Sequence, residues 1–187
     1  MKSNGVILGI SSSFLICLTA CGDGIDREAL KPLISVCSGE GITQAAAYNP
    51  ATEIKPMVGI EQKDETKIDL SYIDVKWRAK TIADTQLVAC IKHQPKKLIE
   101  TCKYASQNNS NLTYSVERYR NQADVVLLEA KTAKIIAKDT LAGEPLTCND
   151  SLKLKRNSSG NKSEYTGDTN LQVNISNWTK EKSVGKK

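Results

Sequence analysis

The stretch that decides the fold class runs from Val125 to Leu141 and reads VVLLEAKTAKIIAKDTL. Two largely apolar segments, 125–130 and 135–141, flank the four residues KTAK, which is the pattern of a β-hairpin. β-branched residues, which favour pleated strands, are frequent in both segments. The stretch therefore predicts two antiparallel strands joined by a tight turn.

Upstream of this hairpin, alternating apolar and polar residues predict further strands. The alternation occurs in residues 112–117 and again in 68–72, which is typical of strands with one face in a core. Its phase slips at Ile73, which indicates a bulge or a bend. We therefore expect a mainly β, α+β domain with its antiparallel sheet in residues 57–150.

A short helix is expected before the sheet. The i, i+3, i+4, i+7 spacing is shown by Leu30, Leu33, Ile34 and Cys37, and Gly39 is placed to end the helix. Residues 38–56 are small and irregular, and they fit either a tether or a loop that lies on the domain. Near the end of the chain, residues 171–178 fit either a final strand or a short helix.

The composition limits the class of protein. The chain has 187 residues, of which 40% are hydrophobic and 25% charged, so a wholly disordered chain, a collagen and a multi-span membrane protein are excluded. Aromatic residues make up only 5%, so the core must be built mostly from aliphatic side chains. One domain is expected at this length.

The N-terminus has the features of an export signal. Residues 1–4 are weakly basic, and 5–18 form an apolar stretch that is too short and too rich in Gly and Ser for a stable transmembrane helix. It ends in LTAC, residues 18–21, which resembles the lipobox of bacterial lipoproteins. The resemblance implies a signal peptide over 1–20, cleavage between Ala20 and Cys21, and a lipid on the Cys21 thiol.

This lipid would hold the protein on a membrane without any contribution from the fold. Residues 21–56 would then be the lipid-anchored N-terminal segment and tether. Gly22 stands where an Asp resembles an inner-membrane retention signal in enteric bacteria, so we expect the outer membrane, facing the periplasm. The alternatives are an ordinary cleaved signal, whose cysteine later joins a disulfide, and an uncleaved apolar anchor.

Four cysteines remain once Cys17 is lost with the signal and Cys21 is lipidated. An even number of cysteines in an oxidising compartment predicts two structural disulfides. We expect Cys90 to pair with Cys102, because a hairpin with its turn at Gln94–Lys97 would bring them together. Cys37 and Cys148 would then form the second disulfide.

The sequence holds no recognisable catalytic, cofactor or metal site. Every hydrolytic triad would need His93, the single histidine, and its neighbours Lys92, Gln94 and Pro95 predict an exposed turn. Carboxylate pairs such as Asp69 with Asp74 show nothing about a shared cleft. Phosphate-binding glycine loops, Cys-x-x-Cys pairs and calcium loops are absent from the sequence. We therefore expect no enzyme, no cofactor and no metal.

Positive charge is concentrated at the C-terminal end of the chain. The Asn/Ser/Lys-rich segment 151–187 has eight Lys or Arg against three Asp or Glu. A solvated tail is the simplest interpretation. An anionic envelope component is the possible partner of seven of these eight basic residues, which are Lys153, Lys155, Arg156, Lys180, Lys182, Lys186 and Lys187. A nucleic acid is not expected as a partner in this compartment, and no protein partner can be named.

Residues 87–148 also resemble an uncharacterised family of secreted or anchored bacterial domains. The matching features include LVAC at 87–90, TCKY at 101–104, RYR at 118–120, LEAKTAK at 128–134 and GEP at 143–145. This family commonly has Gly where the chain has Ala133. Because Ala adopts a positive φ less readily than Gly, the tight turn with positive φ that the family implies is not predicted at this position. It implies no catalytic residues.

These features together predict a lipid-anchored envelope protein with a non-catalytic binding or structural role. One alternative is a small periplasmic enzyme or enzyme inhibitor with a site built from residues far apart in the sequence. A second alternative is a carrier that holds a lipid ligand inside the β domain.

Overall fold

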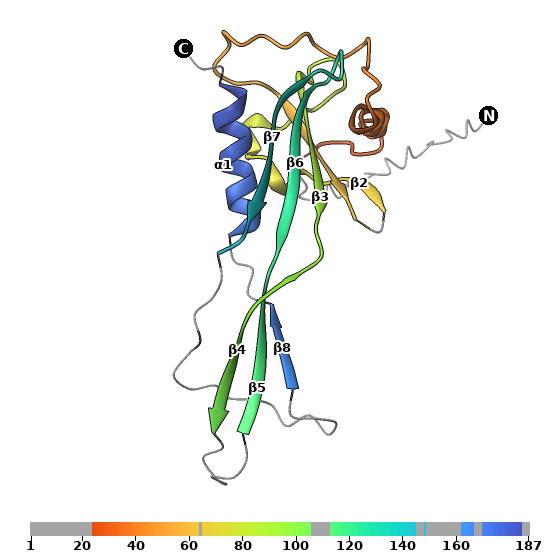
Figure 1. Ribbon diagram of the computed structural model, residues 1–187. Coiled ribbons are helices and arrows are strands. Elements are labelled where there is room, and N and C mark those ends of the chain that lie inside the picture. The colour runs from red at the N-terminus through yellow and green to blue at the C-terminus, as the bar shows by residue number, and fades with distance from the viewer. Residues whose placement is uncertain are drawn as a thin grey trace, which may run out of the picture.

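The computed structural model describes residues 24–63, 65–105, 113–144, 148, 162–166 and 170–184. The predicted signal peptide with Ala20 and Cys21 lies outside these residues, as does Leu112. The described chain is mainly β, as predicted, and forms two sheets with strand orders β2-β1-β3-β6-β7 and β4-β5-β8 (Figure 1). The strands are β1 (Met57–Gln62), β2 (Thr66–Ile68), β3 (Leu87–His93), β4 (Lys97–Ala105), β5 (Thr113–Arg120), β6 (Gln122–Glu129), β7 (Ile135–Ala142) and β8 (Lys162–Thr166).

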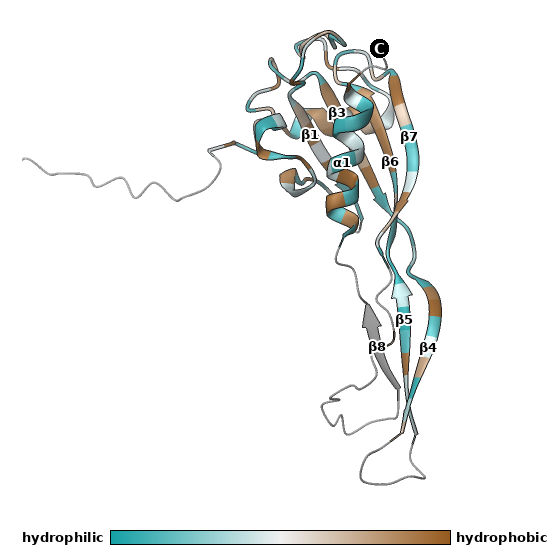
Figure 2. Ribbon diagram, turned by 90° about the vertical axis from the view of Figure 1, so that its left-hand side faces the viewer, coloured by the Kyte–Doolittle hydropathy of each residue, from teal (hydrophilic) through white to brown (hydrophobic). Residues whose placement is uncertain are grey.

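The two sheets share a continuous pair of strands. Only Gln94, Pro95 and Lys96 separate β3 from β4, and only Asn121 separates β5 from β6. The five-stranded sheet belongs to a packed unit, which we call the body, and the three-stranded sheet extends from it as a narrow ribbon (Figures 1 and 2). Each sheet is mixed, because β1 pairs parallel with β3 and β5 pairs parallel with β8.

Both faces of the five-stranded sheet are covered. A 3₁₀ helix, η1 (Lys31–Ser38), packs on one face through Leu33 and Val36, and α1 (Leu171–Ser183) covers the other through Ile175. Along β3, Val88 faces the η1 side and Ala89 faces the α1 side, and both are fully buried. The central strands therefore lie between two apolar layers rather than having one face in water.

Of the two regions considered for a helix, the N-terminal one differs from the prediction in kind. The N-terminal one is a 3₁₀ helix that begins just before Pro32 and ends at Gly39, whose φ of 93° closes it as predicted. The α-helix is C-terminal and resolves the ambiguity of residues 171–178. Its buried stripe is formed by Leu171 and Ile175, with Trp178 one turn further on. None of the helices in the described residues has the length and apolar content to cross a bilayer.

After η1, residues 39–56 form an irregular loop that lies on the body. The Ile42 N–H donates to the Ala130 carbonyl at 2.9 Å, and the Tyr48 hydroxyl donates to the Ser183 carbonyl at 3.0 Å. Lys55 is fully buried, and its ammonium group donates to the backbone carbonyl of Thr52. Burial lowers the pKa of Lys55. Of the two interpretations of this segment, the loop on the domain matches the structure.

Both disulfides involve the expected cysteines, but the predicted pairing is wrong. Cys37 bonds to Cys90, and Cys102 bonds to Cys148. The hairpin that was to join Cys90 to Cys102 does not form, because β3 pairs with β6 in the body while β4 pairs with β5 in the ribbon. The chain passes through Gln94–Lys96 without reversing direction, so Cys90 and Cys102 lie in different sheets.

The hairpin of residues 125–141 is confirmed as β6 and β7, which pair antiparallel. Its turn places Ala133 at a φ of 56°. The Ala133 N–H donates to the Glu129 carbonyl, and the Glu129 N–H donates to the Lys134 carbonyl, both at 2.9 Å. The turn with positive φ that the resemblance did not predict here is therefore present, with alanine in a region that favours glycine.

We expect Ala133→Gly to stabilise the protein, because glycine adopts this φ without the steric cost that a Cβ carries. The gain should be about 0.5–1 kcal/mol in the free energy of unfolding, measured by urea denaturation. Ala83→Gly, at an exposed position in another loop, is the control and should give no gain. A loss of stability in Ala133→Gly would show that methyl packing outweighs the backbone term.

Candidate functional site

The segment of residues 69–78 crosses one face of the body sheet and forms two short turns. They are η2 (Leu70–Tyr72) and η3 (Val75–Trp77). The Asp69 carboxylate accepts the Ser71 N–H at 2.9 Å, and the Asp74 carboxylate accepts the Lys76 N–H at 3.0 Å. Such local bonds compete with strand pairing. The strand predicted for 68–72 is therefore wrong beyond Ile68, where β2 ends.

Gly59 in β1 lets this segment lie directly on the sheet. The Asp69 N–H donates to the Gly59 carbonyl at 2.9 Å. A Cβ at position 59 would lie 2.4 Å from the Asp69 carbonyl oxygen, closer than atoms can approach. A side chain at this position would push η2 away from the sheet.

A polar cluster lies between η2 and the C-terminal ends of β1 and β3. The Glu61 carboxylate, which is 8% exposed, lies at its centre. One oxygen is 2.9 Å from Lys67 Nζ; the other is 2.9 Å from His93 Nε2 and accepts the Tyr72 hydroxyl at 3.3 Å. The Tyr72 hydroxyl is also 3.0 Å from His93 Nε2. The cluster thus connects β1, β2, η2 and β3.

The electrostatics of this cluster favour an ionised Glu61. Burial alone would raise the pKa of Glu61, but the hydrogen bond and charge of Lys67, together with His93, hold it below its usual value. A catalytic relay needs a carboxylate and a nucleophile on different ring nitrogens of histidine. Here Glu61 and Tyr72 both contact Nε2 of His93. This geometry is not that of a relay; it is that of a buried carboxylate whose oxygens have hydrogen-bond and charge partners.

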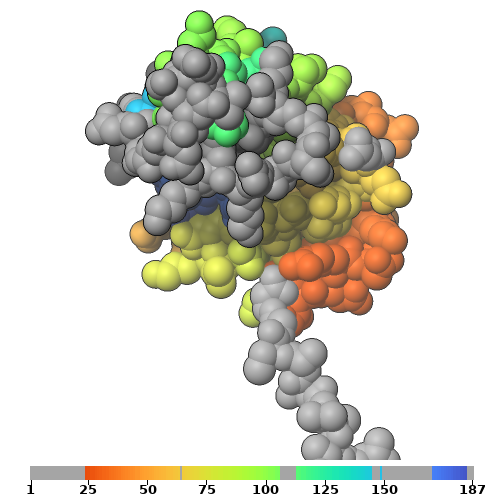
Figure 3. All heavy atoms as spheres, turned by 90° about the horizontal axis from the view of Figure 1, so that it is seen from below, coloured from red at the N-terminus to blue at the C-terminus, as the bar shows by residue number. Residues whose placement is uncertain are grey.

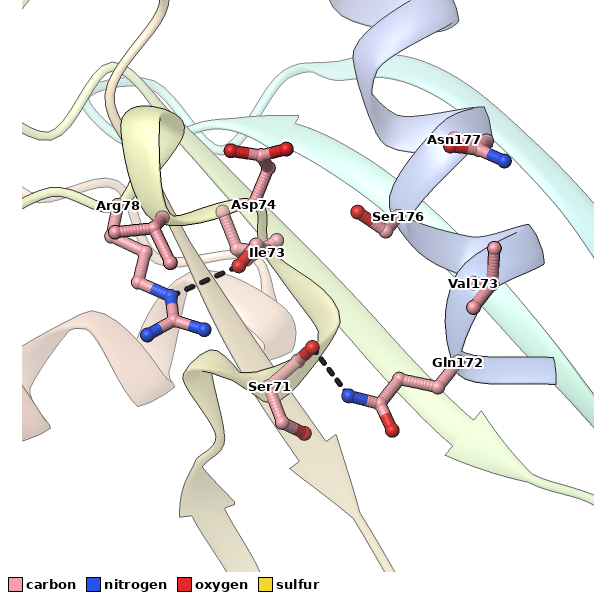
Figure 4. A pocket seen from close by; sticks show the side chains of 9 residues that line it. Ser71, Ile73, Asp74, Arg78, Gln172, Val173, Ser176 and Asn177 are labelled. Atoms are coloured by element: carbon pink, nitrogen blue, oxygen red, sulfur yellow. Dashed lines mark hydrogen bonds between the residues drawn. The ribbon is translucent and has the colours of Figure 1, made fainter. Parts of the chain in front are cut away.

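A pocket of about 300 Å³ opens between residues 71–78 and α1 (Figure 4). We call it the α1 pocket. The wall from the first segment consists of Ser71, Ile73, Asp74, Val75 and Arg78. The wall from α1 consists of Gln172, Val173, Ser176 and Asn177. Gln172 and Ser176 point from the helix toward the opposite wall (Figure 4).

Two polar contacts hold the walls of the α1 pocket together. The Gln172 side-chain amide donates to the Ser71 carbonyl at 2.7 Å, and Lys180 Nζ lies 2.7 Å from the Asp74 carboxylate. The hydrogen bond from Lys180, with that from the Lys76 N–H, lowers the pKa of Asp74. Arg78 Nε donates to the Ile73 carbonyl at 2.9 Å, which fixes the start of its guanidinium group.

The predicted exposed turn at His93 is wrong. His93 ends β3, its side chain is only 24% exposed, and it contacts Glu61 and Tyr72. No local sequence pattern indicates these contacts, because the partners lie in segments that precede His93 by about 20 and 30 positions. Of the acidic pairs, Asp69 and Asp74 begin η2 and η3 rather than sharing a cleft.

The basic residues of the C-terminal segment are described only in part. Lys180 pairs with Asp74, and Lys182 pairs with Glu181 at 2.7 Å. The five others that we expected to meet an anionic component, Lys153, Lys155, Arg156, Lys186 and Lys187, lie outside the described residues. Within the described chain, the one grouping of possible metal ligands, Glu100 with Cys102 and Cys148, has both sulfurs in a disulfide.

The residues of the α1 pocket were missed by sequence reasoning. One signal was present in residues 171–178. Leu171, Ile175 and Trp178 form the helical apolar stripe, and Val173 falls outside it, where a polar residue is expected. Val173 is 52% exposed, so it marks the helix face that carries the pocket.

The chain matches no protein-family model, no curated protein and no solved structure. The likeness of residues 87–148 to an uncharacterised family and that of residues 18–21 to a lipobox therefore stay predictions from sequence.

We expect Gly59→Ala to destabilise the protein by about 1–3 kcal/mol, the usual range for an overpacked core. The added methyl group meets the Asp69 carbonyl, which belongs to backbone and cannot rotate away. Urea denaturation measures the change, and Gln62→Ala in the same strand is the control. Wild-type stability in Gly59→Ala would contradict the close approach.

Glu61→Gln should lower stability at pH 7 by about 2 kcal/mol, because it removes the charge that Lys67 and His93 contact. The folded pKa of Glu61 lies below its usual 4.5, so its contribution is present above pH 4.5 and is lost as pH falls through the folded value. The difference from wild type should therefore shrink as the pH falls below 4.5 and through the lowered folded pKa. The exposed Glu40→Gln is the control, and a difference independent of pH would contradict this assignment.

Proposed function

We propose that the chain is a lipid-anchored bacterial envelope protein with a non-catalytic binding or structural role. The observation that supports this best is the arrangement of a covered body, which begins directly after the proposed anchor, and a ribbon that projects from it. The proposed location is the outer membrane, facing the periplasm.

The distance between the proposed lipid and the folded body is short. Three peptide steps connect Cys21 to Gly24, and they span at most about 11 Å. Leu30 is already fully buried, and η1 packs beside Ile68 and Leu70. Seen from below, the orange residues of this first segment lie next to the yellow residues that follow β1 (Figure 3). A lipid at Cys21 would therefore hold the body close to the bilayer.

The ribbon suits contact with another molecule. It extends away from the body (Figure 2), and the outward side chains of β4 at Lys97, Thr101 and Lys103 are exposed. The Cys102–Cys148 disulfide braces β4 against the segment that connects β7 to β8. Two disulfides also favour an exported protein, because the cytoplasm keeps thiols reduced.

The histidine geometry supports a non-catalytic role. His93 uses one ring nitrogen for both Glu61 and Tyr72, so it does not connect a carboxylate to a nucleophile. The cluster instead provides partners for the buried Glu61 carboxylate at the base of the ribbon, where β3 leaves the body.

Metabolic labelling with a radioactive fatty acid tests the anchor. Labelled wild-type protein and unlabelled Cys21→Ala are expected, because the Cys21 thiol is the proposed site of lipid attachment. Cys17→Ala, four residues earlier in the same signal, is the matched control and should keep the label. Equal labelling of Cys21→Ala and wild type would refute the proposal, as would unlabelled wild-type protein in the expressing bacterium.

A further inference from the structure

The two disulfides lie in different surroundings. Cys37–Cys90 belongs to the body, where Cys90 is 5% exposed in the central strand β3 and Cys37 packs, partly buried, against the same core. Cys102 is 4% exposed in β4, at the edge of the ribbon sheet (Figure 1), but its partner Cys148 is exposed. A dissolved thiol can therefore approach the ribbon disulfide from the side of Cys148, whereas neither cysteine of the body disulfide is exposed.

Two opposite charges lie beside the ribbon disulfide. Arg118 Nη1 is 4.0 Å from Cys148 Sγ, and Arg118 is itself only 5% exposed. The same guanidinium group pairs with the Glu100 carboxylate, which has an oxygen within 4.8 Å of both sulfurs. A nearby cation favours a thiolate, and a nearby carboxylate opposes it. Arg118 thus stabilises negative charge on sulfur when the disulfide opens, and Glu100 reduces that effect.

We propose that Cys148 is a thiol-exchange site, at which a small-molecule thiol opens the ribbon disulfide while the body disulfide stays closed. Accessibility decides which sulfur of a disulfide is attacked, and exposed disulfides are the reactive ones. A small thiol needs only the exposed side of Cys148 and no separation of the paired strands. The inference concerns the ribbon and does not depend on the proposed lipid anchor.

The exchange proceeds in two steps. In the first, the thiolate of the small thiol attacks Cys148 Sγ and forms a mixed disulfide there. The Cys102–Cys148 bond breaks, and Cys102 leaves as a thiolate that takes a proton from water. In the second, another thiolate attacks the small thiol's sulfur in the mixed disulfide, and Cys148 leaves as a thiolate beside Arg118. Two thiols are thereby oxidised to one disulfide, and the ribbon disulfide is reduced by the same two electrons.

Incubation of the purified full-length protein with reduced glutathione tests this order of opening. Cysteines that are already free are blocked with N-ethylmaleimide. Samples are then quenched with acid after different times, labelled with deuterated N-ethylmaleimide and analysed by peptide mass spectrometry. At early times Cys102 should carry the label and Cys148 a glutathione adduct. Both should form at least about tenfold faster than label on Cys37 or Cys90, because a buried disulfide reacts only when the fold opens.

Glu100→Gln should speed the exchange by about three- to tenfold, because it removes a negative charge that repels the attacking and the departing thiolates. Glutamine keeps an oxygen that can accept a hydrogen bond from Arg118. Glu117→Gln is the matched control. It makes the same change of charge next to Arg118 in β5 but on the opposite face of the strand, so the rate should stay that of wild type. Circular dichroism verifies that both variants are folded.

Four results would overturn the inference. They are labelling of all four cysteines together, no labelling of Cys102 while the body stays folded, a glutathione adduct on Cys102 instead of Cys148, and a wild-type rate in Glu100→Gln. None of these results affects the fatty-acid labelling of Cys21. Failure of this inference is therefore distinct from failure of the proposed function.

Discussion

The close approach of Asp69 to Gly59 is the contact on which the α1 face of the body depends. With no side chain at position 59, the segment that follows β2 lies flat on β1. Tyr72 then reaches Glu61 and His93 on the inner side of η2. Ser71 and Ile73, its neighbours in sequence, line the α1 pocket. The buried polar cluster and the pocket are therefore two sides of one short segment, positioned by one glycine.

The two disulfides brace different parts of the chain. Cys37–Cys90 ties η1 to the central strand of the body, and Cys102–Cys148 ties the chain after β7 to the ribbon. The bonded cysteines are 53 and 46 positions apart in the sequence. The loss of loop-closure entropy in the unfolded chain therefore lets each disulfide stabilise the folded state by about 4 kcal/mol. Cys37–Cys90 therefore braces the body, and Cys102–Cys148 joins β4 of the ribbon to the segment that connects β7 to β8.

Sequence reasoning succeeded where local pattern determines structure and failed where distant pairing does. The hairpin of β6 and β7 and the end of η1 at Gly39 follow from local residue types, and both were predicted correctly. The cysteine pairing was not, because β3 and β4 look like a hairpin in sequence but each pairs with a later strand. The His93 contacts and the α1 pocket were missed for the same reason: their partners come together only through the folded topology.

The continuity of strands between ribbon and body has a mechanical consequence. β4 continues into β3 and β5 into β6, so a pull on the far end of the ribbon acts along these strands. Hydrogen bonds between antiparallel strands run perpendicular to the strand direction. Because β3 and β6 are pulled in the same direction, the load passes in shear to their ladders with β1 and β7, which run from Met57 opposite Leu87 to Gln62 opposite Lys92 and from Gln122 opposite Ala142 to Leu128 opposite Ile135. A protein that is anchored through its body and pulled through its ribbon would therefore resist extension until several strand–strand hydrogen bonds break together.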